Sequence, residues 1–129
     1  FLFSTSHPPS VAATCLAALD ILMEQPELID GLWENTRFFK AGLNELGFNT
    51  GMSESPITPV IVGDAALAMS LSDRLFARGV FAQGIGFPTP ARDKARVRTI
   101  VTATHTREQL QFALDAFGHV GRELGIIRG

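Results

Sequence analysis

The chain has 129 residues, of which 46% are hydrophobic and 19% are charged. This composition predicts one folded unit of ordinary domain size, and it excludes a disordered chain, which would need fewer apolar residues and more charge. The 11 Lys and Arg residues against 13 Asp and Glu residues give a net charge of -2. Nucleic acid is therefore not an expected partner, because no overall positive field is present to hold a phosphate backbone.

No membrane segment is expected either. The longest apolar stretch, residues 11–23, contains Thr14 and Asp20 and is too short to span a bilayer of about 30 Å. The residues before it lack the basic segment of a secretory signal. The single cysteine, Cys15, excludes an internal disulfide and a multi-cysteine zinc site. Because Cys15 is predicted to lie on a helix, we expect it to be a small core residue rather than a nucleophile. The low cysteine content fits a reducing compartment, and we expect the protein to be cytoplasmic.

Two helices in tandem are predicted for the first 47 residues. Residues 4–10 form a loop with prolines and hydroxyl side chains that can begin and cap a helix. Apolar residues at spacings of three and four follow, until Pro26 ends this helix and opens a second one. The second helix is expected to end at Gly47. Its apolar stripe consists of Ile29, Leu32, Trp33, Thr36, Phe39, Leu43 and Leu46.

A strand, a helix and another strand are predicted next. Residues 57–62 form a short apolar run, and Pro59 within it indicates an edge strand or a strand entry, because proline has no N–H to donate. Asp64 can cap the following helix, which Gly79 would end. Residues 80–87 are then predicted to form a second strand.

The last part of the chain is predicted to form a third strand and a final helix. Residues 95–104 alternate between apolar and polar side chains, which is typical of a half-buried strand. Arg96 and Arg98 lie on its polar face. Thr106 and Gln109 have the spacing of a capping box in front of the last apolar helix. The element order predicts an α/β fold of two layers (α+β).

Arg98 is the strongest candidate for a functional residue. A guanidinium on a strand presents a rigid planar fork of donors that suits a carboxylate or a phosphate. The competing interpretation is a surface arginine paired with Asp or Glu. Arg96 lies on the same face and either doubles the positive site or is solvated, and the residues alone do not decide between these alternatives.

Several other residues have a structural explanation beside a functional one. The hydroxyl groups of residues 4–6 could bind a phosphate at a helix start, or could only cap that helix. Gly84 lies in a Gly-Ile-Gly segment that lacks the rest of a dinucleotide-binding motif, so close packing or a bulge explains it. His105 is more typical of a hydrogen-bonded structural histidine than of an acid or a base. Lys40 and Lys94 lack the setting of a Schiff-base lysine.

Two motifs resemble the C-terminal part of the α-oxoamine synthases. They are residues 1–9 (FLFSTSHPP) and residues 95–98 (ARVR), the latter followed by residues 102–106 (TATHT). The resemblance covers essentially the whole chain. It implies a pyridoxal phosphate (PLP) enzyme of the aspartate aminotransferase fold that condenses an amino acid with an acyl-CoA. Within the family the chain most resembles the glycine C-acetyltransferase type (2-amino-3-ketobutyrate coenzyme A ligase), whose substrates are glycine and acetyl-CoA. Synthases of 8-amino-7-oxononanoate or 5-aminolevulinate share these motifs.

The resemblance also implies roles for individual residues. Arg98 is expected to bind the carboxylate of the amino-acid substrate, and Thr89 is expected to lie near the substrate end of the active site. Ser4 and Thr5 match family positions that reach across a homodimer interface to the cofactor phosphate of the neighbouring subunit. No metal site is expected.

The resemblance further implies that the chain is a fragment of a longer enzyme. Residues 1–47 would be an N-terminal loop with linking helices, and residues 48–129 would be the small C-terminal domain of a fold-type I PLP enzyme. The family's cofactor lysine lies upstream of the matching region, so no catalytic residue is expected in this chain, and the chain alone should be inactive.

Two interpretations from other functional classes stay open. The predicted elements between residues 57 and 124 make up most of a ferredoxin-like fold, which would suit a non-catalytic module that binds an amino acid. The two leading helices are superfluous to that fold. Alternatively, these helices could belong to an interaction domain that seeks a partner, because their apolar stripe would leave exposed surface in a fragment.

Overall fold

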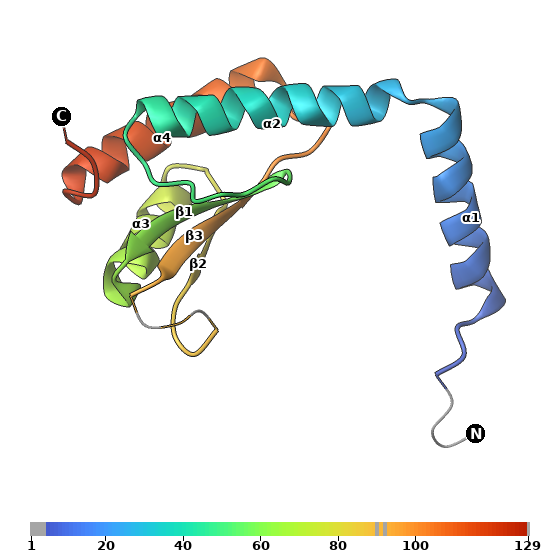
Figure 1. Cartoon of the computed structure of the whole chain (residues 1–129), viewed down its shortest axis with the longest axis horizontal. Helices are drawn as coiled ribbons and strands as arrows, with labels where there is room; N and C mark the ends of the chain where they lie inside the picture. The colour runs from blue at the N-terminus through green and yellow to red at the C-terminus, as the bar shows by residue number, and fades with distance from the viewer. Residues whose placement is uncertain (1–4, 90, 92, 129) are drawn as a thin grey trace.

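The computed structural model describes residues 5–89, 91 and 93–128, and its elements follow the predicted order (Figure 1). Two long helices come first and a small α/β unit follows. The elements are α1 (Pro9–Glu24), α2 (Glu27–Glu45), β1 (Ile57–Gly63), α3 (Ala65–Ala77), β2 (Gln83–Ile85), β3 (Ala95–Ile100) and α4 (Arg107–Glu123). The predicted two-layer α/β fold class is thereby confirmed.

The three strands form an antiparallel sheet in the order β1-β3-β2. β1 is an edge strand, as Pro59 predicts. β2 is shorter than predicted, because the Ser72 hydroxyl on α3 donates to the Ala82 carbonyl at 2.6 Å and accepts from the Gly84 N–H at 3.1 Å. The bond to Ala82, and the bond from the Val80 N–H to the Leu75 carbonyl at 2.9 Å, tie the start of the predicted strand to α3 instead of to the sheet.

β3 also ends earlier than the predicted residue 104. The chain leaves the sheet in a turn after Val101, where the Thr102 N–H donates to Nδ1 of His105 at 3.0 Å. Asn35 on α2 fixes the same turn by donating to the carbonyls of Thr102 and His105, at 3.2 and 2.8 Å. His105 is thus the hydrogen-bonded residue that the sequence predicts.

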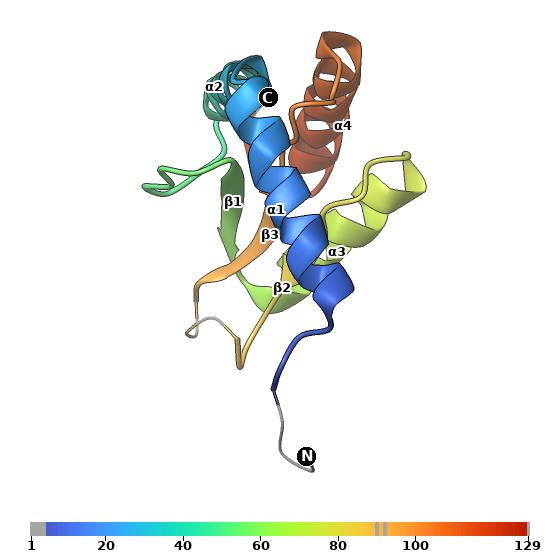
Figure 2. The ribbon, with the colours of Figure 1, turned by 90° about the vertical axis from the view of Figure 1, so that its right-hand side faces the viewer.

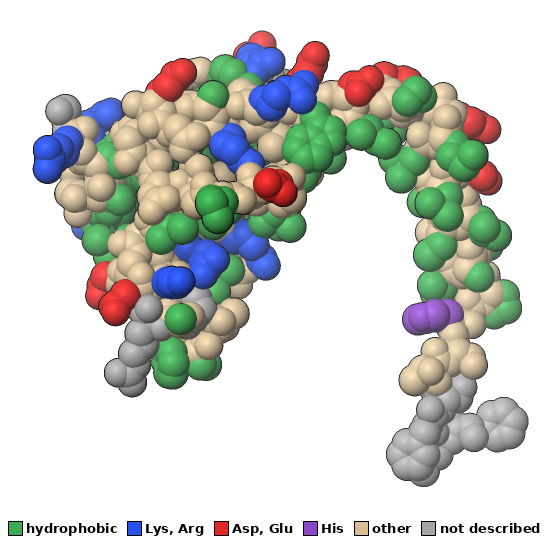
Figure 3. Space-filling model, viewed as in Figure 1, with side chains coloured by type: hydrophobic (Ala, Val, Ile, Leu, Met, Phe, Trp, Pro, Cys, Tyr) green, Lys and Arg blue, Asp and Glu red, His purple; other side chains and the backbone are tan. Residues whose placement is uncertain are grey.

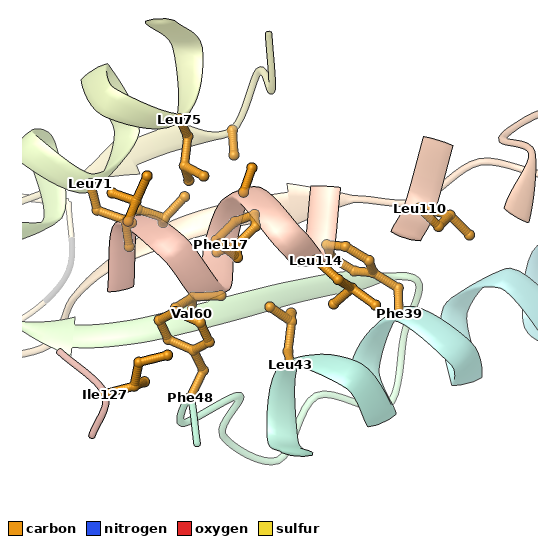
Figure 4. Close-up of a cluster of buried hydrophobic side chains, with 14 of the residues drawn as sticks. Phe39, Leu43, Phe48, Val60, Leu71, Leu75, Leu110, Leu114, Phe117 and Ile127 are labelled. Carbon is orange, nitrogen blue, oxygen red and sulfur yellow. The ribbon is translucent and has the colours of Figure 1, made fainter. Parts of the chain in front are cut away.

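The helices α3 and α4 cover one side of the sheet and leave the other side open (Figure 2). The second half of α2 packs along α4. The buried side chains between these layers form one hydrophobic core, which includes Phe39, Leu43, Phe48, Val60, Leu71, Leu75, Val97, Leu114 and Phe117 (Figure 4). The core therefore takes residues from both sides of the predicted boundary at residue 47, and the division into two parts stays a prediction.

Both predicted caps are present. The Asp64 carboxylate accepts from the Leu67 N–H at 2.7 Å at the start of α3. Thr106 and Gln109 form a reciprocal capping box at the start of α4. Each cap satisfies backbone N–H groups that the first helical turn leaves without partners. The two helices that cover the sheet thus begin where the sequence predicts.

Helix α1 extends away from the α/β unit and contributes no buried residue (Figure 1). The expectation that Cys15 is a core residue is wrong: it is exposed, because no other described element packs on α1. The apolar side chains of α1, including Leu16, Leu19 and Met23, are exposed as well. No helix among the described residues has the length and apolar character needed to cross a membrane.

Phe117 is the central side chain of the core, fully buried and in edge contact with Phe39 and Phe48, at ring centroid distances of 6.1 and 5.8 Å. We expect Phe117→Ala to lower the free energy of unfolding by about 3 to 5 kcal/mol, because it leaves a cavity between the sheet and two helices. Denaturant unfolding measures this change. The control, Phe112→Ala, removes a ring that is 55% exposed and should cost about 0.5 kcal/mol or less; equal losses would contradict the prediction.

Gly84 lies where β2 approaches α3, as its close-packing interpretation predicts. A Cβ atom there would lie 2.9 Å from Sδ of Met69 and 3.1 Å from the Ala68 carbonyl. We expect Gly84→Ala to lower the free energy of unfolding by about 1 to 3 kcal/mol through overpacking. Gly31→Ala on α2 meets open space and should instead raise it by about 0.5 to 1 kcal/mol. Thermal unfolding of both variants tests the opposite signs.

Candidate anion-binding site on the open face of the sheet

The open face of the sheet carries a pocket of about 350 Å³, here called the open-face pocket. Side chains alternate along a strand, so the residues on this face are the sequence neighbours of core residues such as Val60 and Val97. The pocket is lined by Ile57, Pro59, Ile85, Thr89, Arg96 and Arg98. The structure therefore brings together Arg98 and Thr89, the two residues predicted to contact a substrate.

Arg98 is held at the middle of this face by strand pairing on both sides. It lies opposite Pro59 of β1 and Gln83 of β2. One terminal nitrogen, Nη2, donates to Oε1 of Gln83 at 3.0 Å. A neutral amide orients the guanidinium without neutralising it, so the remaining donors can still bind an anion.

The alternative of a surface ion pair for Arg98 is not what the structure shows. The ion pairs of the described residues all involve Glu123, whose partners are Arg74, Arg78 and His119. These groups lie on α3, at its C-cap Arg78, and on α4, none of them in the sheet. Arg98 keeps an uncompensated charge in the described structure.

Arg96 extends the positive charge of the pocket. It is half-buried and lies on the same face, two residues before Arg98, which corresponds to about 7 Å along a strand. Its Nε donates to the carbonyl of Lys94 at 3.1 Å. Among the residues that the structure describes, none with a carboxylate lines the pocket. Basic side chains gather over the strands below α2, beside hydrophobic ones, as Figure 3 shows.

The residues predicted to contact a cofactor phosphate lie elsewhere. Thr5 is exposed and precedes α1, on the part of the chain that is remote from the sheet (Figure 1). Ser4 lies outside the described residues. Neither residue belongs to the open-face pocket, so their predicted role stays a prediction.

Gln83 is the site residue that sequence reasoning missed. It is 15 positions from Arg98 in the chain, and only the antiparallel register brings their side chains together. No local motif marks such a pair. Sequence reasoning could have found it by assuming that β2 and β3, which are close in the sequence, pair in an antiparallel manner, and by then extending the alternation of β3 to its neighbour.

A second, larger cavity of about 660 Å³ lies where β2 begins and β3 ends, between the segment before β2 and the first half of α4. Most of its walls are apolar, including Phe81, Phe112 and Ile100. Arg98, Gln83 and His105 contribute to its rim, together with Glu108. Hydrogen bonds from the backbone and from the Thr106 side chain hold the pKa of Glu108 below its ordinary value. This carboxylate is therefore charged at neutral pH.

Neither lysine is placed to attach a carbonyl cofactor. Nζ of Lys40 donates to the Ser53 carbonyl at 2.5 Å, and Lys94 is exposed in the loop before β3. Neither lysine lines the open-face pocket. The chemistry available there is anion binding by guanidinium groups, with a threonine hydroxyl beside them.

Comparison with known proteins identifies similar chains. Residues 1–117 match the family aminotransferase class I and II. The chain is 70% identical over 127 residues to 8-amino-7-oxononanoate synthase of Symbiobacterium thermophilum, covering 98% of this chain and 32% of that protein. It is 56% identical over 128 residues to 8-amino-7-oxononanoate synthase/2-amino-3-ketobutyrate coenzyme A ligase of Thermus thermophilus, covering 99% of this chain and 32% of that protein.

Solved structures agree with this family. The fold matches Sphingomonas wittichii serine palmitoyltransferase with a TM-score of 0.88 and 31% identity, over 98% of this chain and 32% of that one. It matches the 8-amino-7-oxononanoate synthase of Francisella tularensis with a TM-score of 0.77 at 24% identity, over 94% of this chain and 35% of that one, which shows the fold alone. The chain spans about a third of the length of the curated relatives it matches.

Proposed function

We propose that this chain, which belongs to the aminotransferase class I and II family, provides the amino-acid carboxylate site of an α-oxoamine synthase. Enzymes of this family depend on PLP. The observation that supports the proposal is the oriented, uncompensated guanidinium of Arg98 in a pocket that has no carboxylate of its own. The ferredoxin-like module and the interaction domain find no support in these comparisons.

The proposed action of Arg98 is binding and orientation. A guanidinium can donate two parallel hydrogen bonds to a carboxylate, which fixes both the position and the plane of the substrate. The bond to Gln83 limits the rotation of the fork, and the apolar residues Pro59 and Ile85 line the pocket beside it. Thr89 adds a hydroxyl at the rim of the same pocket. The substrate α-carbon is thereby held in a defined direction.

In the proposal the chain does not supply the lysine that attaches the cofactor, which is supported by the position of Lys40 and Lys94 outside the open-face pocket. The electron-withdrawing chemistry of the family belongs to PLP. In the proposal, the lysine that attaches PLP comes from another part of the complete enzyme, and the 129-residue chain alone is inactive. Ser4 and Thr5 keep their proposed role at the cofactor phosphate of a second subunit in a homodimer.

Among the synthases of this family, the relatives favour 8-amino-7-oxononanoate formation. Several similar proteins carry that name, whereas the predicted glycine C-acetyltransferase type is supported by the double name of the Thermus relative. The two products differ chemically. 8-Amino-7-oxononanoate contains the two carbons left when alanine loses its carboxylate, joined to a seven-carbon acyl group with a carboxylate at its far end. 2-Amino-3-ketobutyrate contains glycine joined to an acetyl group.

A product assay distinguishes these two proposals. The complete PLP-loaded enzyme is incubated with alanine and the coenzyme A thioester of heptanedioic acid, or with glycine and acetyl-CoA. We expect release of coenzyme A and carbon dioxide with the first pair and an amino ketone whose mass corresponds to 8-amino-7-oxononanoate. Turnover with glycine and acetyl-CoA alone would restore the glycine C-acetyltransferase interpretation, and no turnover with either pair would overturn both.

Replacement of Arg98 tests the carboxylate site. We expect Arg98→Gln to lower kcat/KM for the amino acid by about 10- to 100-fold, because a charge-assisted hydrogen bond is worth roughly 1.5 to 3 kcal/mol. Arg98→Lys should recover only part of this loss, since it keeps the charge and loses the fork. Steady-state kinetics at saturating acyl donor measure both variants.

Arg107→Gln is the matched control for Arg98. Arg107 stacks on the Phe38 ring at 3.9 Å from the ring centroid, outside the open-face pocket. Its replacement should leave kcat/KM unchanged within about twofold, as expected for a surface arginine remote from the substrate. An equal effect of the Arg98 and Arg107 variants would contradict the proposed role of Arg98.

A further inference from the structure

The positive charge of Arg96 has no ion-pair partner among the described residues. Its single hydrogen bond to a described residue runs from Nε to the carbonyl of Lys94, and this bond leaves both Nη groups with no partner among the described residues. The residue is half-buried, and its direct cross-strand neighbours are Ile61 and Ile85. A guanidinium in such surroundings is partly removed from water and receives no compensating negative charge from the protein.

The other clustered arginines of the chain show how a structural charge is satisfied here. Arg74 and Arg78 both reach the carboxylate of Glu123, which joins α3 to α4. Arg96 has no such carboxylate, although it is less exposed to solvent than Arg98 beside it. This contrast favours a ligand, rather than a neighbouring side chain, as the partner of Arg96.

The spacing of the two arginines sets the kind of ligand. Arg96 and Arg98 are about 7 Å apart along β3, which is too far for one carboxylate to hold both forks in the bidentate manner. Two anionic groups are needed to neutralise the pocket. If Arg98 binds the amino acid, as proposed above, the other substrate of the synthase can supply the second group, since its acyl chain or its carrier bears an anion.

We propose that Arg96 binds an anionic group of the acyl thioester donor, so that the two arginines of β3 hold the two substrates side by side. This inference rests on the proposed function. The recognised chemistry is an oxyanion, supplied either by a carboxylate at the far end of the acyl chain or by a phosphate of the thioester carrier. In both cases the anchored Nε fixes the direction of the two free Nη groups.

Arg96→Gln and Arg96→Lys in the complete PLP-loaded enzyme test the inference. We expect Arg96→Gln to raise the KM of the acyl donor about 10- to 100-fold and to change the KM of the amino acid by less than about threefold. Arg98→Gln should show the reverse pattern. Arg96→Lys should recover part of the donor KM, because the charge remains. Arg107→Gln serves again as the control.

Four donors distinguish the two sources of the oxyanion. They are the heptanedioyl and heptanoyl thioesters, each carried either on coenzyme A or on uncharged N-acetylcysteamine. If a chain-end carboxylate is the ligand, the effect of Arg96→Gln disappears with both heptanoyl donors. If a phosphate is the ligand, the effect disappears with both N-acetylcysteamine donors. Either pattern supports the inference.

The inference is overturned if Arg96→Gln leaves the KM of all four donors unchanged. A change in melting temperature alone would indicate only a structural role for Arg96. It is overturned equally if Arg96→Gln raises only the KM of the amino acid, because Arg96 would then merely enlarge the site of Arg98. Binding measurements separate this failure from a failure of the proposed function. Calorimetric titration with free heptanedioate and with free coenzyme A measures binding without turnover. We expect at least one of these ligands to bind the unmodified enzyme about 10-fold more tightly than it binds the Arg96→Gln variant.

Discussion

The two-residue period of the central strand is the constraint on which the rest of the structure depends. β3 is paired on both sides, with Val97 opposite Val60 on β1 and opposite Gly84 on β2. This register places Val97 in the core and both Arg96 and Arg98 on the open face. A shift by one residue would bury two guanidinium groups against Phe117 and expose the valine. Burial of the core and exposure of the two arginines therefore specify the same register.

The neighbours of β3 are matched to this division. Pro59 lacks an N–H group, so it belongs on the edge strand, and its ring lines the pocket beside Arg98. Gly84 leaves room for α3 to approach β2, while the adjacent Gln83 faces Arg98. Ser72 bonds to Ala82 just before β2 and to Gly84 within it, and these two bonds hold the backbone on both sides of Gln83. Side chains on both sides of the sheet thus position one guanidinium.

The features that could be predicted from sequence are those determined by nearby residues. Helix periodicity, the caps at Asp64 and Thr106 and the alternation of β3 all depend on spacings of two to four residues, and they are confirmed. The longer strand predicted from residue 80 failed because Ser72 competes for its backbone, and this contact spans 10 positions. The burial of Cys15 failed because an apolar helix face indicates that a partner is needed without showing that one is present.

The residues of the candidate site also divide into those that local sequence predicts and those that depend on tertiary contacts. Arg98 could be singled out because the guanidinium fork and its place on a polar strand face are local properties. Gln83 could not, since its contact with Arg98 depends on how two strands pair. The absence of a carboxylate from the pocket is also a tertiary property, because any of the 13 Asp and Glu residues could have approached it. Only the structure shows which arginines have an ion pair within the described part of the protein.

The two arginines of β3 would also differ in what they contribute to substrate specificity within the family. The substrates of the two product types named among the relatives both begin as amino acids with a carboxylate, so a residue that binds this group cannot distinguish between them. The donors differ much more, because an acetyl group is short and uncharged whereas a heptanedioyl group ends in a carboxylate. Selection must therefore depend on groups that contact the donor. If the proposed ligand of Arg96 is the chain-end carboxylate and not a phosphate that both donors carry, this half-buried cation of the open-face pocket would contact the group that differs between the two donors.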